Sequence, residues 1–434
     1  MKKNIILILS LLFFITGNAQ FKVSGEIRNY AEQSIMIRIF NGSEDKLINK
    51  VTTDKNGKFT VKIPKRYSGI VRLVSPSAHS SMDLLTDNEN IQFSAEIEED
   101  KFTDIAVTEG ENAKGYELYK NYESYHDLKI NVFPIVKALY TKEDEFYKAM
   151  EKEENRIAKL APNLELPLLK YYIQVFELSN AQVDTKQSAE VYKNKILGRL
   201  VNDNNYLEGT SLMTSLVLNY MRYSIFDAQN QEEINLTLEK EIDNLLEKTD
   251  LETPRGQNVL SSIFMVLPAD QFSTLLNKYY DKANALTCEI TDDLKGKITA
   301  HKQMVVGNQV PNITFDKPIK GNKSLYDIKA NKKLIIFWAS WCPACQDEMP
   351  YIKEYYRNFK QEGGEIISIS LDFDETAFKE ATKDFEWINY TELAQWDTQG
   401  VVEFGVAQTP TLFLIDKDNK LVKTAFHISE LVEL

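Results

Sequence analysis

Two cysteines three positions apart, Cys342 and Cys345, are the residues of this sequence best suited to do chemistry. They follow an apolar run from Leu334 to Trp338, which predicts a buried strand. A helical pattern begins directly after them, so the pair falls where a strand meets a helix N-terminus. Orphan N–H groups and partial positive charge at such an end lower the pKa of a thiol. This context predicts a redox-active dithiol, with Cys342 as the attacking thiolate and Cys345 as the resolving thiol.

A structural disulfide and half of a zinc site are the alternatives for this pair. A zinc ribbon needs two further ligands, and the C-terminal region offers only the isolated His427. The third cysteine, Cys288, stands alone and fits either a buried inert thiol or an intermolecular disulfide. We therefore expect redox chemistry, with no metal site and no cofactor.

The segment Trp341-Cys342-Pro343-Ala344-Cys345 resembles the active site of thioredoxin. Glu348 resembles the acidic residue of the membrane-associated, extracytoplasmic branch, the TlpA/ResA-like thiol–disulfide oxidoreductases. Further along, Thr409 and Pro410 precede an apolar strand and resemble the cis-proline loop of the same family. The resemblance covers residues from about 307 to 434, under a third of the chain.

This resemblance implies a proton-handling role for Glu348. The buried Asp that a typical thioredoxin carries on the strand before its cysteines aligns with Ile336 here. With that acid absent, Glu348 would pass the proton to and from Cys345, which lies on the same helix face. The alternative is an ordinary solvated carboxylate in the first helical turn.

The resemblance also implies a substrate-contact surface. Pro410 would be cis, and the backbone of Thr409 and Pro410 would pair with the substrate chain like an added strand. Trp341 would flank the site. The alternative is a trans proline ahead of an edge strand.

The N-terminus has the pattern of a signal peptide. Its short basic start is followed by an apolar run from Ile5 to Ile15, then by small residues ending at Ala19. The apolar run is too short for a comfortable membrane span, although an uncleaved anchor is an alternative. Gln20 follows the expected cleavage point where a lipoprotein needs Cys. We expect a periplasmic protein that is not a lipoprotein and is not stably inserted in the membrane once the signal is removed.

Composition and pattern divide the 434 residues into a signal peptide at 1–19 and three domains. Residues 20–110 alternate apolar and polar and predict a β-sandwich, similar to the uncharacterised β-rich domain of bacterial exported proteins. Within it, the turn at Asp54–Gly57 predicts a hairpin. Residues 111–303 predict an α-helical domain. Residues 304–434 predict an α/β thioredoxin-like domain, with core strands at 333–338, 365–371, 411–416 and 421–426.

These features favour an exported thiol–disulfide oxidoreductase. No His lies between the cysteines to stabilise a thiolate, so reduction is favoured over oxidation. The resemblance implies disulfide-containing exported proteins as partners and a membrane thiol transporter as electron donor, with cytochrome c maturation as a family-level option. The net charge of −13 argues against nucleic-acid binding. The alternatives are an extracytoplasmic binding or adaptor protein with a secondary redox domain, and a thiol peroxidase.

Overall fold

The computed structural model describes residues 21–43, 45–76, 80–127, 132–158, 165–202, 205–406 and 408–432. The predicted signal peptide, 1–19, lies outside the described residues. No helix in the described part of the chain is long and apolar enough to cross a membrane.

Strands whose residues alternate between buried and exposed form the first domain, because one face of each sheet must cover a core. Two four-stranded sheets, ordered β4-β1-β7-β8 and β3-β2-β5-β6, enclose a cluster of aliphatic and aromatic side chains. The predicted sandwich is confirmed. Its strands are β1 (Phe21–Arg28), β2 (Ser34–Phe40), β3 (Asp45–Thr52), β4 (Lys58–Ile63), β5 (Ser68–Ser75), β6 (Ser80–Asp87), β7 (Ile91–Glu98) and β8 (Lys101–Glu109).

The hairpin predicted at Asp54–Gly57 is wrong, although the turn itself is present. The Asp54 carboxylate accepts hydrogen bonds from the backbone N–H groups of Asn56 and Lys58. The strands on either side belong to different sheets, because β3 pairs with β2 and β4 pairs with β1. The carbonyl of Gly57 accepts the N–H of Ile27 at 2.9 Å, which holds the turn against β1. The turn therefore carries the chain from one sheet to the other.

Helices form the second region, which confirms its predicted helical character, and all of them except the second and third contribute to one apolar core. The first of them begins two residues after β8 ends. The helices are α1 (Glu111–Asp127), α2 (Phe133–Lys137), α3 (Glu145–Ala158), α4 (Pro167–Ser179), α5 (Lys186–Asn202), α6 (Met213–Ser224), α7 (Gln231–Thr249), α8 (Pro254–Val266), α9 (Ala269–Asn284) and α10 (Asp292–Gln303). Side chains of the sandwich, including Phe40 and Ile70, belong to the same core cluster as these helices. The first two regions are thus packed together.

The third region is a five-stranded sheet with helices, the expected thioredoxin-like architecture. The sheet order is β13-β12-β11-β14-β15, with β11 parallel to β12 and antiparallel to β14. The four predicted core strands are confirmed, and β13 is an additional short edge strand. The elements are β9 (Thr314–Ile319), β10 (Asn322–Ser324), β11 (Lys332–Trp338), α11 (Pro343–Gln361), β12 (Glu365–Ser370), α12 (Glu375–Thr382), β13 (Ile388–Thr391), α13 (Gln399–Phe404), β14 (Thr411–Asp416) and β15 (Leu421–Ala425).

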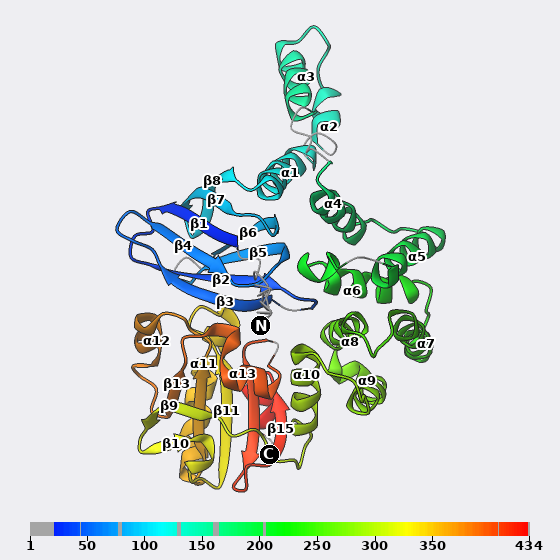
Figure 1. The fold of residues 1–434 in the computed structure, drawn as a ribbon. Helices are drawn as coiled ribbons and strands as arrows, with labels where there is room; N and C mark the ends of the chain where they lie inside the picture. Colours follow the sequence, from blue (N-terminus) through cyan, green and yellow to red (C-terminus); the bar gives the residue numbers. More distant parts are fainter. Residues whose placement is uncertain are drawn as a thin grey trace, which may run out of the picture.

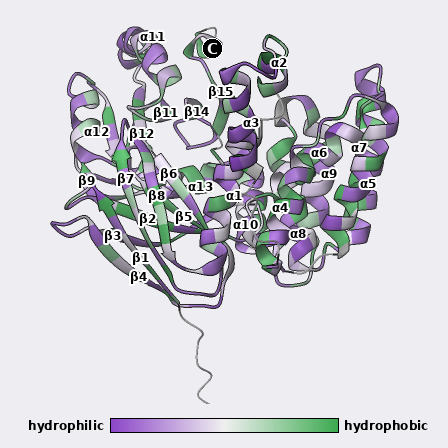
Figure 2. Cartoon of the chain, turned by 90° about the horizontal axis from the view of Figure 1, so that it is seen from above, coloured by the Kyte–Doolittle hydropathy of each residue, from purple (hydrophilic) through white to green (hydrophobic). Residues whose placement is uncertain are grey.

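The sandwich lies over one end of the thioredoxin-like domain, with β2 and β3 nearest to it (Figure 1). The helical region runs along the side of both, and α10 packs against α13. Seen from above, the strands of the sandwich carry hydrophobic and hydrophilic residues in turn (Figure 2). Three regions of different architecture therefore meet around the end of the third domain where α11 begins.

Candidate active site

The dithiol lies where the fully buried central strand β11 passes into α11. All residues of β11 after the first are buried, so the strand end is fixed by the core on both faces. Cys342 occupies the N-cap position of α11, and Pro343 opens the helix where its missing N–H costs nothing. Cys342 is 8% exposed, whereas Cys345, one turn further, is fully buried. The two cysteines thus differ in exposure, and only Cys342 keeps any surface in contact with solvent.

The two sulfurs also differ in acidity. Burial alone would raise the pKa of Cys342, but hydrogen bonds from the Cys345 thiol, Thr409 and the backbone N–H groups of Cys345 and Ala344 hold that pKa below its ordinary value. Burial, together with the hydrogen bond and charge of Cys342, raises the pKa of Cys345 to about 12. In its protonated form, Cys342 donates from Sγ to the Thr409 carbonyl at 3.5 Å. This difference in pKa suits Cys342 as the nucleophile and Cys345 as the thiol that reacts second.

Alkylation should reveal this asymmetry. Because the rate follows the thiolate fraction, iodoacetamide is expected to label Cys342 with a midpoint below the ordinary thiol pKa of about 8.5. Cys345 should be labelled only after Cys342 and far more slowly, because it is fully buried and burial raises the pKa of its thiol. Peptide mass spectrometry of the reduced Cys288→Ser protein across pH 5–10 measures both rates without a competing thiol. Labelling of Cys345 before Cys342 would contradict the assignment.

The loop of Thr409 and Pro410 reaches the dithiol because β14 pairs with β11. The register sets Thr411 opposite Phe337, so the residues before β14 arrive beside the end of β11. The Thr409–Pro410 peptide bond is cis, as the resemblance implied. Trp341, next to Cys342, is half-buried.

Glu348 is 8% exposed and sits one turn after Cys345 on α11. One carboxylate oxygen accepts the N–H of Ile428 at 2.6 Å, and the other lies 3.2 Å from Nδ1 of His427. The His427 side chain is 65% exposed. The carboxylate is therefore sheltered from water but joined to it through His427. No pattern in the sequence indicates this contact, since 79 positions separate the two residues.

Asp372 is a second residue near the site that sequence patterns did not single out. It is buried two residues after the end of β12. Its carboxylate accepts hydrogen bonds from the backbone N–H of Ser340 at 3.1 Å and from the Ser340 hydroxyl at 2.6 Å. Ser370 donates to the same carboxylate. These bonds fix the loop two residues ahead of Cys342. An acidic residue at the end of a buried strand is the signal that could have pointed to it.

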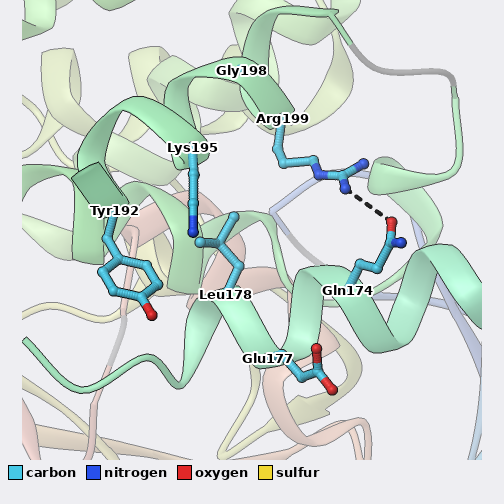
Figure 3. A pocket seen from close by; sticks show the side chains of 7 residues that line it. All are labelled: Gln174, Glu177, Leu178, Tyr192, Lys195, Gly198 and Arg199. Atoms are coloured by element: carbon cyan, nitrogen blue, oxygen red, sulfur yellow. Dashed lines mark hydrogen bonds between the residues drawn. The ribbon is translucent and has the colours of Figure 1, made fainter. Parts of the chain in front are cut away.

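A hollow of about 560 Å³ between α4 and α5 lies apart from this chemistry (Figure 3). Its lining includes neither cysteine nor histidine, and Arg199 crosses it to bond Gln174 at 2.9 Å. Among the residues that the structure describes, no group of three or more His, Cys, Asp or Glu side chains could hold a metal ion. The dithiol is the best candidate site in the described chain.

The C-terminal region that contains the dithiol is similar to known proteins. The model of the AhpC/TSA family matches residues 306–424. The thiol-disulfide oxidoreductase ResA of Bacillus thuringiensis is 32% identical over 130 residues, which are 30% of this chain and 74% of that protein. The chain belongs to the ResA thiol-disulfide oxidoreductase family. ResA of Bacillus subtilis is 27% identical over 139 residues, 32% of this chain and 77% of the relative. The ResA-like part is the thioredoxin-like domain, and the protein is accordingly an oxidoreductase.

Solved structures are also similar to part of this chain. The thioredoxin domain of a thiol-disulfide oxidoreductase from Bacteroides vulgatus is 27% identical, with a TM-score of 0.27, covering 30% of this chain and 94% of that chain. A thiol:disulfide interchange protein DsbE from Chlorobium tepidum is 22% identical, with a TM-score of 0.27, covering 30% of this chain and 92% of its own.

Proposed function

We propose that this protein is an exported reductase of disulfides in extracytoplasmic proteins. The observation that carries the proposal is the unequal dithiol at the start of α11, with a slightly exposed Cys342 of lowered pKa and a fully buried Cys345 of raised pKa. The basic start and apolar run of the first nineteen residues support export. A membrane thiol transporter is the proposed source of electrons.

The chemistry is two successive thiol–disulfide exchanges. The Cys342 thiolate attacks one sulfur of the substrate disulfide, the substrate S–S bond breaks, and the other substrate sulfur leaves as a thiolate that takes up a proton. Cys345 then loses its proton and attacks the Cys342 sulfur, which releases the second substrate thiol. The substrate gains two electrons and two protons, and the enzyme ends with a Cys342–Cys345 disulfide that an external dithiol must reduce.

Glu348 is proposed to accept the proton of Cys345 in the second exchange. Once Cys342 is in the mixed disulfide, it carries no negative charge, so the charge and hydrogen-bond contribution that raised the Cys345 pKa disappears, while burial remains. A proton acceptor is still needed, and Glu348 lies one turn away on the same helix. His427 gives that carboxylate a route to solvent.

Glu348→Gln is expected to slow resolution of the mixed disulfide about 100-fold, because an amide cannot take up the proton. Glu354→Gln, an exposed carboxylate on the same helix, is the matched control and should have no effect. Quenched-flow trapping of the mixed disulfide between pH 5 and 9 measures this step. An unchanged rate and pH profile in Glu348→Gln would remove the residue from the mechanism.

A single-turnover assay tests the function itself. Reduced full-length protein is mixed with an equimolar disulfide-linked peptide, and both are followed by mass spectrometry. We expect one peptide disulfide to be consumed for each protein molecule that loses two hydrogens. Peptide oxidation by the oxidised protein, without reduction by the reduced form, would reverse the proposed direction.

A further inference from the structure

A cleft of about 430 Å³ lies between the sandwich and the thioredoxin-like domain. Its walls come from two parts of the chain that are more than 250 positions apart. Its lining includes Arg38, Asp45 and Arg72 from the sandwich, and Trp341, Gln395 and Trp396 from the thioredoxin-like domain. Neither domain alone makes this cleft, which is why a catalytic domain on its own would lack it.

Arg38 holds the two walls together. Its side chain on β2 is only 11% exposed and bonds Asp45 on β3 at 2.9 Å. The same guanidinium donates to both carboxylate oxygens of Asp397, which belongs to the 3-10 helix Gln395–Asp397. Bidentate, charge-assisted hydrogen bonds between Arg and a carboxylate fix the relative orientation of the two groups as well as their distance. The ion pairs of Arg38 therefore fix the positions of the two domains relative to each other, and with them the shape of the cleft.

The cleft opens beside the nucleophile. Trp341, which lines it, is the residue directly before Cys342. A polypeptide segment lying in the cleft would therefore contact Trp341, and a disulfide flanking that segment would lie near Cys342. A cavity of this volume accommodates a few side chains, so the fitting occupant is an extended segment.

The charges around the cleft favour a cation. Both guanidinium groups are already paired: Arg38 as above, and Arg72 with the two oxygens of Asp83 at 2.8 and 2.9 Å. Asp45 lines the cleft, and Asp397 and Asp83 pair with its two arginines from outside the lining, so this ion-paired group of three carboxylates and two guanidinium groups carries one excess negative charge. An anionic ligand would have to displace one of these ion pairs. A cationic ligand would instead relieve the excess.

The aromatic wall points the same way. Trp396 is 41% exposed and, with Trp341, lines the cleft. Indole is the strongest aromatic partner of a cation, because its ring face carries negative charge density. A guanidinium or ammonium group in the cleft could therefore contact the exposed indole of Trp396.

We propose that this cleft binds the segment flanking the substrate disulfide and selects an Arg or Lys next to the substrate cysteine. The proposal rests on the disulfide-reductase function above and names its substrate class. It also gives the sandwich a role, because the sandwich supplies the polar wall of the recognition site.

Three disulfide-linked peptide dimers test this selection on the full-length reduced protein. The blocked peptides are identical except for Arg, Leu or Glu beside the single cysteine. Each kcat/KM is divided by the rate at which dithiothreitol reduces the same peptide, because a neighbouring Arg by itself lowers the pKa of the leaving thiol. The normalised Arg-to-Glu ratio should be about tenfold and should fall as salt rises.

Trp396→Ala should bring that ratio close to one, whereas Tyr351→Ala, an exposed aromatic on α11 outside the cleft lining, should leave it unchanged. A wild-type ratio near one or below, or a ratio that survives Trp396→Ala, would overturn the proposal. Hydroxyethyl disulfide separates the two failures. If this small neutral disulfide is reduced while the peptides show no preference, only the cleft proposal fails. If no disulfide is reduced, the proposed function fails as well.

Discussion

Replacing Cys342 with serine is expected to reduce disulfide exchange to the uncatalysed background, a loss of about 10³-fold or more. A serine hydroxyl is not ionised at neutral pH and cannot form a disulfide, so the first exchange has no nucleophile. Cys345 cannot replace it, because it is fully buried, and burial by itself raises the pKa of its thiol. The measurement is steady-state reduction of a peptide disulfide by the full-length protein, fed by a dithiol.

Cys288→Ser is the matched control for this variant. Cys288 belongs to another part of the chain and contacts the Gln257 amide, far in sequence from the dithiol. It should keep wild-type turnover, and circular dichroism should show both variants folded. Turnover of Cys342→Ser above one tenth of wild type would contradict the nucleophile assignment.

Replacing Cys345 with serine is expected to stop the reaction half-way. Cys342 can still attack, but no thiol remains to resolve the product, so a mixed disulfide between protein and substrate should accumulate to nearly one per protein. Non-reducing electrophoresis and intact-mass measurement would detect the adduct, and a reductant should release it. The double variant Cys342→Ser, Cys345→Ser is the control and should form none.

The outcome of this experiment also distinguishes a dithiol enzyme from a single-cysteine one. Sustained turnover by Cys345→Ser at the wild-type rate, with no adduct, would mean that a second thiol of the chain plays no part. Cys345 would then have no role as the resolving thiol.

The dithiol and its surroundings could be predicted because the signals are local. Leu334 to Trp338 shows its burial through an unbroken apolar run, and the Cys-x-x-Cys spacing places both sulfurs at the junction that follows. The helical region was likewise evident from its periodicity. Short-range patterns of this kind depend little on the rest of the fold.

The contacts made at long range could not be predicted. The turn at Asp54–Gly57 has the residues of a hairpin, yet pairing partners decide which sheet each strand joins. Arg38 and Asp397 are 359 positions apart, and nothing near either residue indicates the other. The same holds for Glu348 and His427. The cleft beside the dithiol arises from such contacts, so only the folded chain reveals it.

The reduction potential of the Cys342–Cys345 pair tests the central claim most directly. Full-length protein would be equilibrated in dithiol buffers of known potential, and its free thiols would be labelled and counted by mass. We predict a reversible two-electron transition near that of thioredoxin, about −270 mV. The reason is that only neutral hydrogen-bond donors stabilise the Cys342 thiolate, and no histidine lies between the cysteines to stabilise it further. A value near about −120 mV, typical of the strong oxidant DsbA, or no reversible transition at all, would contradict a reductase.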